Sequence, residues 1–110
     1  MEKVVLITGS SKGIGKATAV EFAKMGRYKV VINYLTDKEN AEKIANYIEQ
    51  EYKTETLVVK ADVSDEEQVK NMVRETITRF GRIDVLVNNA GIAIDSELKD
   101  KTKASIKICK

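Results

Sequence analysis

Four short apolar runs recur along the chain at nearly equal intervals. They are VVLI from Val4, VVI from Val30, LVV from Leu57 and VLV from Val85, and their first residues lie 26, 27 and 28 positions apart. Each run is continuously apolar and rich in β-branched residues, which is typical of strands covered on both faces. We therefore expect four buried strands.

The segments between these runs have helical periodicity. In the third, apolar positions recur three or four residues apart and form one stripe: Val69, Met72, Val73, Thr76, Ile77 and Phe80. The second carries a shorter stripe of the same kind, and the first helix is expected over about residues 14–25. Strands that alternate with helices predict a parallel sheet whose right-handed crossovers place helices on both faces.

Polar residues and glycines mark where these helices begin and end. Ser64 is the expected N-cap of the third helix, with Glu67 completing a capping box, and Gly81 is placed to end that helix. Either Thr36 or Asp37 can cap the second helix.

The loop TGSSKGIG, residues 8–15, follows the first strand and opens the first helix. Each of its glycines has an expected role. Gly9 permits a tight turn, Gly13 lets a diphosphate approach the backbone, and Gly15 lets the helix pack on the sheet. The helix N-terminus favours an anion at this point. The alternative is a flexible turn with incidental glycines. The position of the loop between a strand and a helix favours a binding site over this alternative.

Composition narrows the remaining possibilities. The chain has 110 residues, a net charge of +2, no histidine and one cysteine, so histidine catalysis and an internal disulfide are excluded. No metal site is predicted. No apolar run reaches the roughly 20 residues of a membrane helix, and nothing indicates a nucleic-acid partner. We expect a cytoplasmic protein with one domain over residues 1–95 and a departing tail over 96–110.

Three motifs in order resemble the N-terminal part of the short-chain dehydrogenase/reductase family: TGSSKGIG, ADVS at residues 61–64 and NNAG at residues 88–91. Within the family, the chain is most similar to the 3-oxoacyl-[acyl-carrier-protein] reductases. The resemblance implies a Rossmann-like, three-layer αβα fold of strand order 3-2-1-4, truncated here after the fourth strand. It also implies a nicotinamide dinucleotide, bound by Gly9, Ser11, Lys12, Gly13, Ile14, Gly15, Asn33, Tyr34, Thr36, Asp62, Val63, Asn89, Ala90 and Gly91.

Residues at the end of the second strand and in the glycine loop favour NADP(H) over NAD(H). Sites that prefer NAD place an acid there for the ribose 2′-hydroxyl, whereas this chain has Asn33. Lys12 supplies a cation for a 2′-phosphate, and Thr36 adds a hydroxyl donor. The alternative is that Lys12 is a solvated lysine and Asn33 a turn former. For Asp62 the alternatives are an adenine contact or an acid at a helix start, and Asn88 is expected to brace the central strand.

The catalytic groups of the short-chain dehydrogenase/reductases are not expected within these 110 residues. Hydride transfer to a carbonyl needs a proton donor, and the family uses a Tyr-x-x-x-Lys pair, a serine and an asparagine. Tyr34 and Lys38 have this spacing, but they follow the second strand, away from any nicotinamide. The chain is expected to be inactive alone, and the parent activity is reduction of a 3-oxoacyl thioester or related carbonyl. The alternative is an inactive dinucleotide-binding or self-associating fragment.

The last residues depart from the family pattern. Residues 96–104 are compatible with a short helix, whereas SIKICK, residues 105–110, alternates as a strand does. The fourth strand is expected at an exposed edge of the sheet, where it invites pairing with another chain. We therefore expect self-association through that strand.

Overall fold

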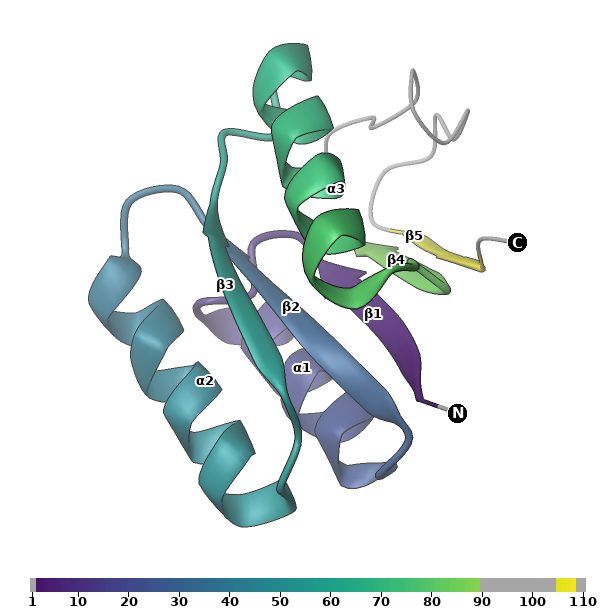
Figure 1. Ribbon diagram of the computed structural model, residues 1–110. Coiled ribbons are helices and arrows are strands. Elements are labelled where there is room, and N and C mark those ends of the chain that lie inside the picture. Colours follow the sequence, from purple (N-terminus) through teal and green to yellow (C-terminus); the bar gives the residue numbers. More distant parts are fainter. Residues whose placement is uncertain (1, 90–104, 109–110) are drawn as a thin grey trace.

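A computed structural model describes residues 2–89 and 105–108 of the chain (Figure 1). Its sheet has the order β3-β2-β1-β4-β5. The strands are β1 (Lys3–Ile7), β2 (Tyr28–Tyr34), β3 (Thr56–Lys60), β4 (Val85–Asn88) and β5 (Ser105–Ile108). The first four are parallel, and their arrangement confirms the predicted order 3-2-1-4.

Three helices cover the two faces of this sheet. They are α1 (Gly13–Lys24), α2 (Lys38–Tyr52) and α3 (Glu66–Phe80). Figure 1 shows α1 and α2 on one face and α3 on the other, which is the predicted three-layer arrangement. All three helices begin at the end of the sheet where the parallel strands finish. Ligands of open α/β sheets bind at this end.

Alternate residues of β1, the central strand, pack into two separate hydrophobic cores. Val5 and Ile7 of β1 belong to the cluster shared with α1 and α2, whereas Val4 and Leu6 belong to the cluster that contains Met72 of α3. These four residues of β1 are at most 1% exposed. A continuously apolar strand is therefore needed because both of its faces are buried.

The helix ends confirm two of the three sequence predictions. Asp37 caps α2 by accepting a hydrogen bond from the Asn40 N–H, and Gly81 ends α3 with φ 83°. The predicted cap of α3 is wrong by one residue. Asp65, rather than Ser64, accepts from the Glu67 N–H. Ser64 instead donates its backbone N–H and its hydroxyl to Asp62, so it is already engaged in a turn.

The fourth strand is not an edge, and that prediction is wrong. β5 pairs with β4 in antiparallel register, Val85 opposite Ile108 and Asn88 opposite Ser105. The chain's own C-terminal segment therefore occupies the hydrogen-bonding edge that was expected to pair with another molecule. The strand pattern of SIKICK is confirmed for residues 105–108, and the alternative helix over 96–104 lies outside the described residues.

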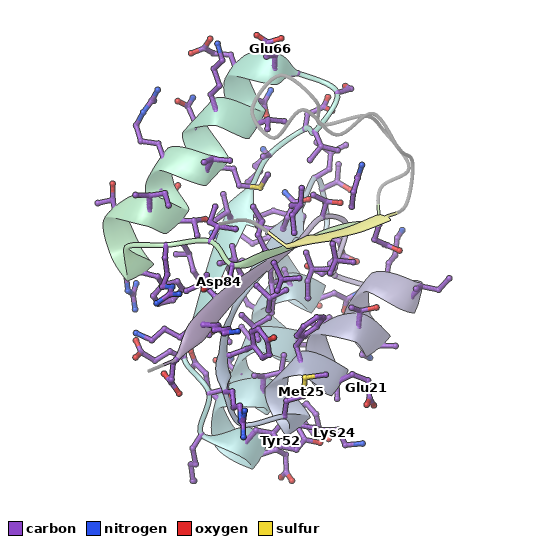
Figure 2. All side chains as sticks on the ribbon, turned by 90° about the vertical axis from the view of Figure 1, so that its right-hand side faces the viewer. Glu21, Lys24, Met25, Tyr52, Glu66 and Asp84 are labelled. Carbon is purple, nitrogen blue, oxygen red and sulfur yellow. The ribbon has the colours of Figure 1, made fainter. Side chains whose placement is uncertain are left out.

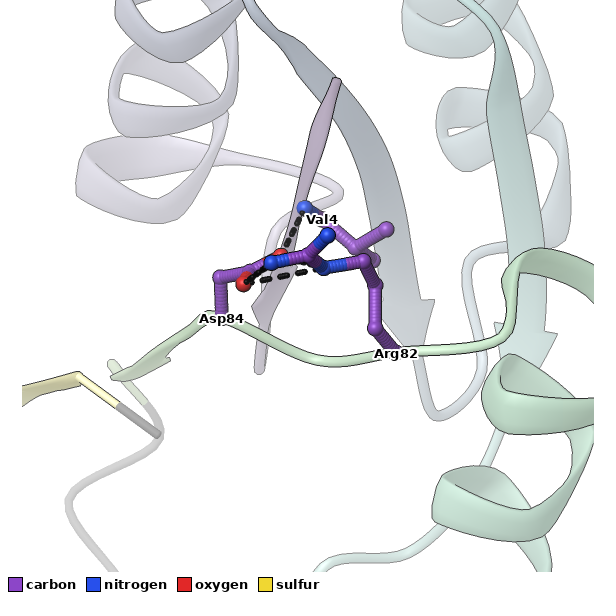
Figure 3. A network of polar contacts seen from close by, with 3 residues as sticks. All are labelled: Val4, Arg82 and Asp84. Carbon is purple, nitrogen blue, oxygen red and sulfur yellow. Dashed lines mark hydrogen bonds and ion pairs between the residues drawn. The ribbon is translucent and has the colours of Figure 1, made fainter. Parts of the chain in front are cut away.

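A polar cluster fixes the opposite end of the sheet (Figure 3). Asp84 accepts from the Val4 N–H at 2.8 Å and from Arg82 Nη2 at 2.7 Å. Its own N–H donates to the Val4 carbonyl at 2.9 Å. These bonds tie β4 to β1 just before β4 begins.

Among the described residues, no helix is long and apolar enough to cross a membrane.

Candidate functional site

The loop from β1 to α1 has two glycines in the left-handed region, Gly9 at φ 59° and Gly13 at φ 61°. Only glycine adopts this conformation without strain. A third glycine is required by close packing. A Cβ on Gly15 would overlap the Gly9 carbonyl oxygen and lie 2.8 Å from Asn89 Nδ2. The loop therefore folds tightly onto the start of its own helix.

Asn33, the last residue but one of β2, lies beneath this loop. Its Oδ1 accepts from the Gly9 N–H at 2.9 Å, and its Nδ2 donates to the Ala61 carbonyl at 3.2 Å. The residue is 2% exposed. The Asn33 amide thus joins the glycine loop to the residue that follows β3, and it supports the loop from the side of the sheet. A direct contact between Asn33 and a cofactor stays a prediction.

Two further asparagines hold the loop from the side of β4. Asn89 Nδ2 donates to the Gly9 carbonyl at 3.1 Å, and Asn88 Oδ1 accepts from the Thr8 hydroxyl at 3.3 Å. Thr8 and Asn88 are buried. The bracing role expected of Asn88 agrees with this contact. Gly9 is consequently fixed through both its N–H and its carbonyl, by Asn33 of β2 and by Asn89 directly after β4.

The N-terminus of α1 differs from those of the other two helices. Asp37 and Asp65 cap α2 and α3 with their carboxylates, whereas Lys12, the N-cap of α1, makes no side-chain capping bond. No acidic residue lies in the first turn of α1. The backbone N–H groups of a first turn have no partner within their helix, so this turn keeps its donors and its positive dipole for an anion.

The surface above this turn is open. A Cβ on Gly13 would meet no described atom within 4 Å, Lys12 is exposed, and the Ile14 side chain is 77% exposed. Ser11 is 7% exposed and lies below the surface. None of the described side chains therefore blocks the approach of a diphosphate to the backbone at Gly13.

The other predicted site residues are distributed around the ends of β2 and β3. Thr36 is exposed beyond β2, whereas Tyr34 is 8% exposed and belongs to the core. Asp62 follows β3, and Val63 packs against the core on the α3 side. The Ser64 hydroxyl and N–H bind the Asp62 carboxylate and lower its pKa below its ordinary value. Ala90 and Gly91 lie outside the described residues.

A cavity of about 580 Å³ adjoins the glycine loop on its α2 side. Lys12 and Lys16 line one wall, and Asn40, Lys43 and Tyr47 of α2 line the other. Only Lys12 of these five was predicted as a site residue. Lys16 follows Lys12 at a spacing of four, a signal that the sequence did contain. The α2 residues carried no such signal, since their approach to the loop depends on how α1 and α2 pack.

Comparisons with known proteins identify the family of this chain. Residues 3–109 match the family model of the short chain dehydrogenases. A 3-oxoacyl-[acyl-carrier-protein] reductase of Staphylococcus aureus is 42% identical over 98 residues, which cover 89% of this chain and 39% of that protein. Versicolorin reductase 1 of Aspergillus parasiticus is 41% identical over 100 residues, covering 91% of this chain and 37% of the relative.

Solved structures give the same result. An alcohol dehydrogenase of the archaeon Thermococcus sibiricus, complexed with 5-hydroxy-NADP, matches with a TM-score of 0.78 and 38% identity over 84% of this chain and 39% of that one. A short-chain dehydrogenase/reductase of Serratia marcescens matches with a TM-score of 0.76 and 33% identity, over 82% and 36%. The chain thus spans about two fifths of the length of these relatives, and it belongs to the short-chain dehydrogenase family.

Proposed function

We propose that this chain is the NADP(H)-binding part of a short-chain reductase. The observation that carries the proposal is the glycine loop, which has an uncapped helix start and an open backbone at Gly13. A dinucleotide diphosphate placed there receives hydrogen bonds from first-turn N–H groups and the favourable end of the helix dipole. The braces from Asn33 and Asn89 to Gly9 hold the loop ready before the ligand arrives.

Two residues support NADP(H) over NAD(H). Asn33 stands at the end of β2, where NAD sites carry an acid for the 2′-hydroxyl, and its buried side chain is a neutral amide. Lys12 is exposed in the loop itself and lines the neighbouring cavity. A 2′-phosphate there meets a cation and no carboxylate from β2. The Thermococcus sibiricus relative, solved with 5-hydroxy-NADP, agrees with this choice of cofactor.

The parent activity that we propose is reduction of a 3-oxoacyl thioester or a related carbonyl. NADPH, when bound, supplies the hydride for such a reduction. The role of the residues described here is to bind and orient that cofactor. Tyr34 is unsuited to donate the proton, because its side chain is buried among core residues on the α1 and α2 side. The 42% identity to the Staphylococcus aureus reductase supports this substrate class.

Titration with NADPH and NADH, followed by nicotinamide fluorescence, tests the proposal. We expect NADPH to bind more tightly than NADH. Lys12→Glu should weaken NADPH binding by about tenfold or more, since it replaces an attractive charge by a repulsive one, and should change NADH binding far less. Lys24→Glu, at the far end of α1, is the matched control for net charge. Equal losses for the two cofactors in Lys12→Glu, or no binding of either to the unaltered chain, would refute the proposal.

A further inference from the structure

The cavity beside the glycine loop is strongly basic. Lys12, Lys16 and Lys43 line it, and no acidic residue does so among the described residues. Lys12 and Lys16 form no salt bridge within the described part of the chain, whereas Lys43 Nζ lies 3.5 Å from Glu39 Oε1. Three cations that converge on one hollow repel each other, and this repulsion is relieved when an anion enters.

The walls and dimensions of the cavity suit a small phosphorylated ligand. Its volume of about 580 Å³ falls within the range of about 300–1,000 Å³ that is usual for small-molecule sites. Ile44, which is 5% exposed, and the ring of Tyr47 contribute apolar surface. Such walls of low dielectric strengthen the field of the lysines. Asn40 also lines the cavity, and its Nδ2 donates to Asp37 Oδ2 at 2.6 Å.

The cavity is continuous with the proposed cofactor site. Lys12 and Gly13 belong to both, and Lys16 lies one helical turn beyond Lys12, with its N–H donating to the Lys12 carbonyl at 3.3 Å. A phosphate monoester on the ribose of a dinucleotide at the loop would therefore face the opening of the cavity. Inorganic phosphate has the same chemistry without the nucleoside, so the two sources must be separated by experiment.

We propose that Lys16 and Lys43 join Lys12 in holding the 2′-phosphate of NADP(H), and that Glu39 weakens this binding by competing for Lys43. The proposal rests on the function proposed above. It adds two specificity-determining residues, one on each helix, and one residue that opposes them. Because the Lys43–Glu39 pair is exposed, with side chains 70% and 82% accessible, it exchanges easily for a ligand phosphate.

The test compares adenosine 2′,5′-bisphosphate with adenosine 5′-monophosphate by calorimetry. Lys16→Gln and Lys43→Gln should each weaken binding of the bisphosphate by about two- to fivefold, the range typical of exposed charge pairs, and leave that of the monophosphate unchanged. Glu39→Gln should strengthen bisphosphate binding by a similar factor. Lys24→Gln is the control. Lys24 is also a lysine of α1, but Figure 2 shows it at the end of the molecule opposite to the start of α3.

Each alternative result has a distinct meaning. If Lys16→Gln and Lys43→Gln behave like Lys24→Gln while the unaltered chain still prefers the bisphosphate, this inference is wrong and the proposed function stands. If the unaltered chain binds neither nucleotide, both are wrong. If inorganic phosphate displaces the bisphosphate at equal concentration, the cavity binds free phosphate instead of the cofactor's ribose phosphate, and the inference is overturned.

Discussion

At the scale of single residues, side-chain amides do most of the positioning at the loop. Asn33 and Asn89 hold the N–H and the carbonyl of Gly9, so a flexible residue type becomes a fixed part of the site. The glycine spacing was visible in the sequence and predicted the loop. The braces were not visible, because each joins residues on different strands and depends on the register of β1 with β2 and β4.

Replacement of Gly15 should cost stability through steric overlap, whereas a Cβ on Gly13, Gly26 or Gly81 would meet nothing within 4 Å. In Gly15→Ala, the new methyl group overlaps the Gly9 carbonyl oxygen, and overpacking of this kind costs about 1–3 kcal/mol or more. We expect urea denaturation to show a net loss of unfolding free energy, although alanine favours a helix by about 1 kcal/mol over glycine.

Gly26→Ala is the matched control for that variant. Gly26 has φ 73° and open space where its Cβ would lie, so alanine there meets only backbone strain of about 1–2 kcal/mol. Gly26→Ala should still allow cofactor binding, whereas Gly15→Ala should abolish it by displacing the loop. If Gly15→Ala binds NADPH as tightly as Gly26→Ala does, the close packing described here is not needed for binding.

Asp84 should make stability fall in acid. Burial alone would raise its pKa, but hydrogen bonds from Arg82 and the Val4 N–H, together with the Arg82 charge, hold the pKa below its ordinary value. The folded chain therefore binds fewer protons than the unfolded chain at this carboxyl. Its stabilising contribution is complete above the unfolded pKa of about 3.9 and is lost as the pH falls through the lower folded pKa.

Asp84→Asn removes this proton linkage. Because hydrogen bonds to a charged group contribute about 1.5–3 kcal/mol, we expect a loss of that order at pH 7 and a flatter dependence of unfolding free energy on pH between about 2 and 5. Glu75→Gln, an exposed position on α3, serves as the control for charge. A full pH dependence in Asp84→Asn would assign the acid sensitivity to other carboxylates.

At the scale of elements, the hydrophobic pattern predicted the strands and helices well. The polar residues that flank the helices predicted the helix caps less well. The continuous apolar runs of β1 to β4 follow from burial on both faces, so pattern and structure agree. Ser64 and Asp65 are both good capping residues, and sequence alone offers no reason to choose Asp65. The choice depends on the turn in which Asp62 already binds Ser64.

The antiparallel strand β5 should protect the edge of β4. In the double variant Ile106→Pro/Lys107→Pro, two adjacent N–H groups of β5 are removed, and proline cannot sit in a paired position. We expect β4 to lose its partner and the variant to associate, with at least a doubling of the mass measured by light scattering at high concentration. Ile106→Val/Lys107→Arg keeps both N–H groups and should behave as the unaltered chain does. A monomeric proline variant would show that β5 does not guard this edge.

At the scale of the whole molecule, the fold was more predictable than the site. The parallel sheet with helices on both faces follows from the alternation of strand and helix. The order 3-2-1-4 came from the family resemblance, because other doubly wound sheets with the same alternation have the order 2-1-3. The cavity depends instead on the packing of α1 against α2, which brings Lys43 toward Lys12 across about 30 residues of chain. No spacing rule connects those two lysines. The pairing of β5 with β4 could not be predicted either, because the alternation of polar and apolar residues predicts a strand but not the strand with which it pairs.

The central claim is that a dinucleotide binds at the carboxyl ends of the strands, on the loop between β1 and α1. Amide chemical-shift mapping by NMR during titration with NADPH tests it most directly. We expect the largest shifts at residues 9–16, with further shifts at Thr36 and Asp62. Amides near Asp84 and Val4, at the opposite end of the sheet, should not move. Shifts centred on that opposite end, or no shifts at saturating NADPH, would contradict the account.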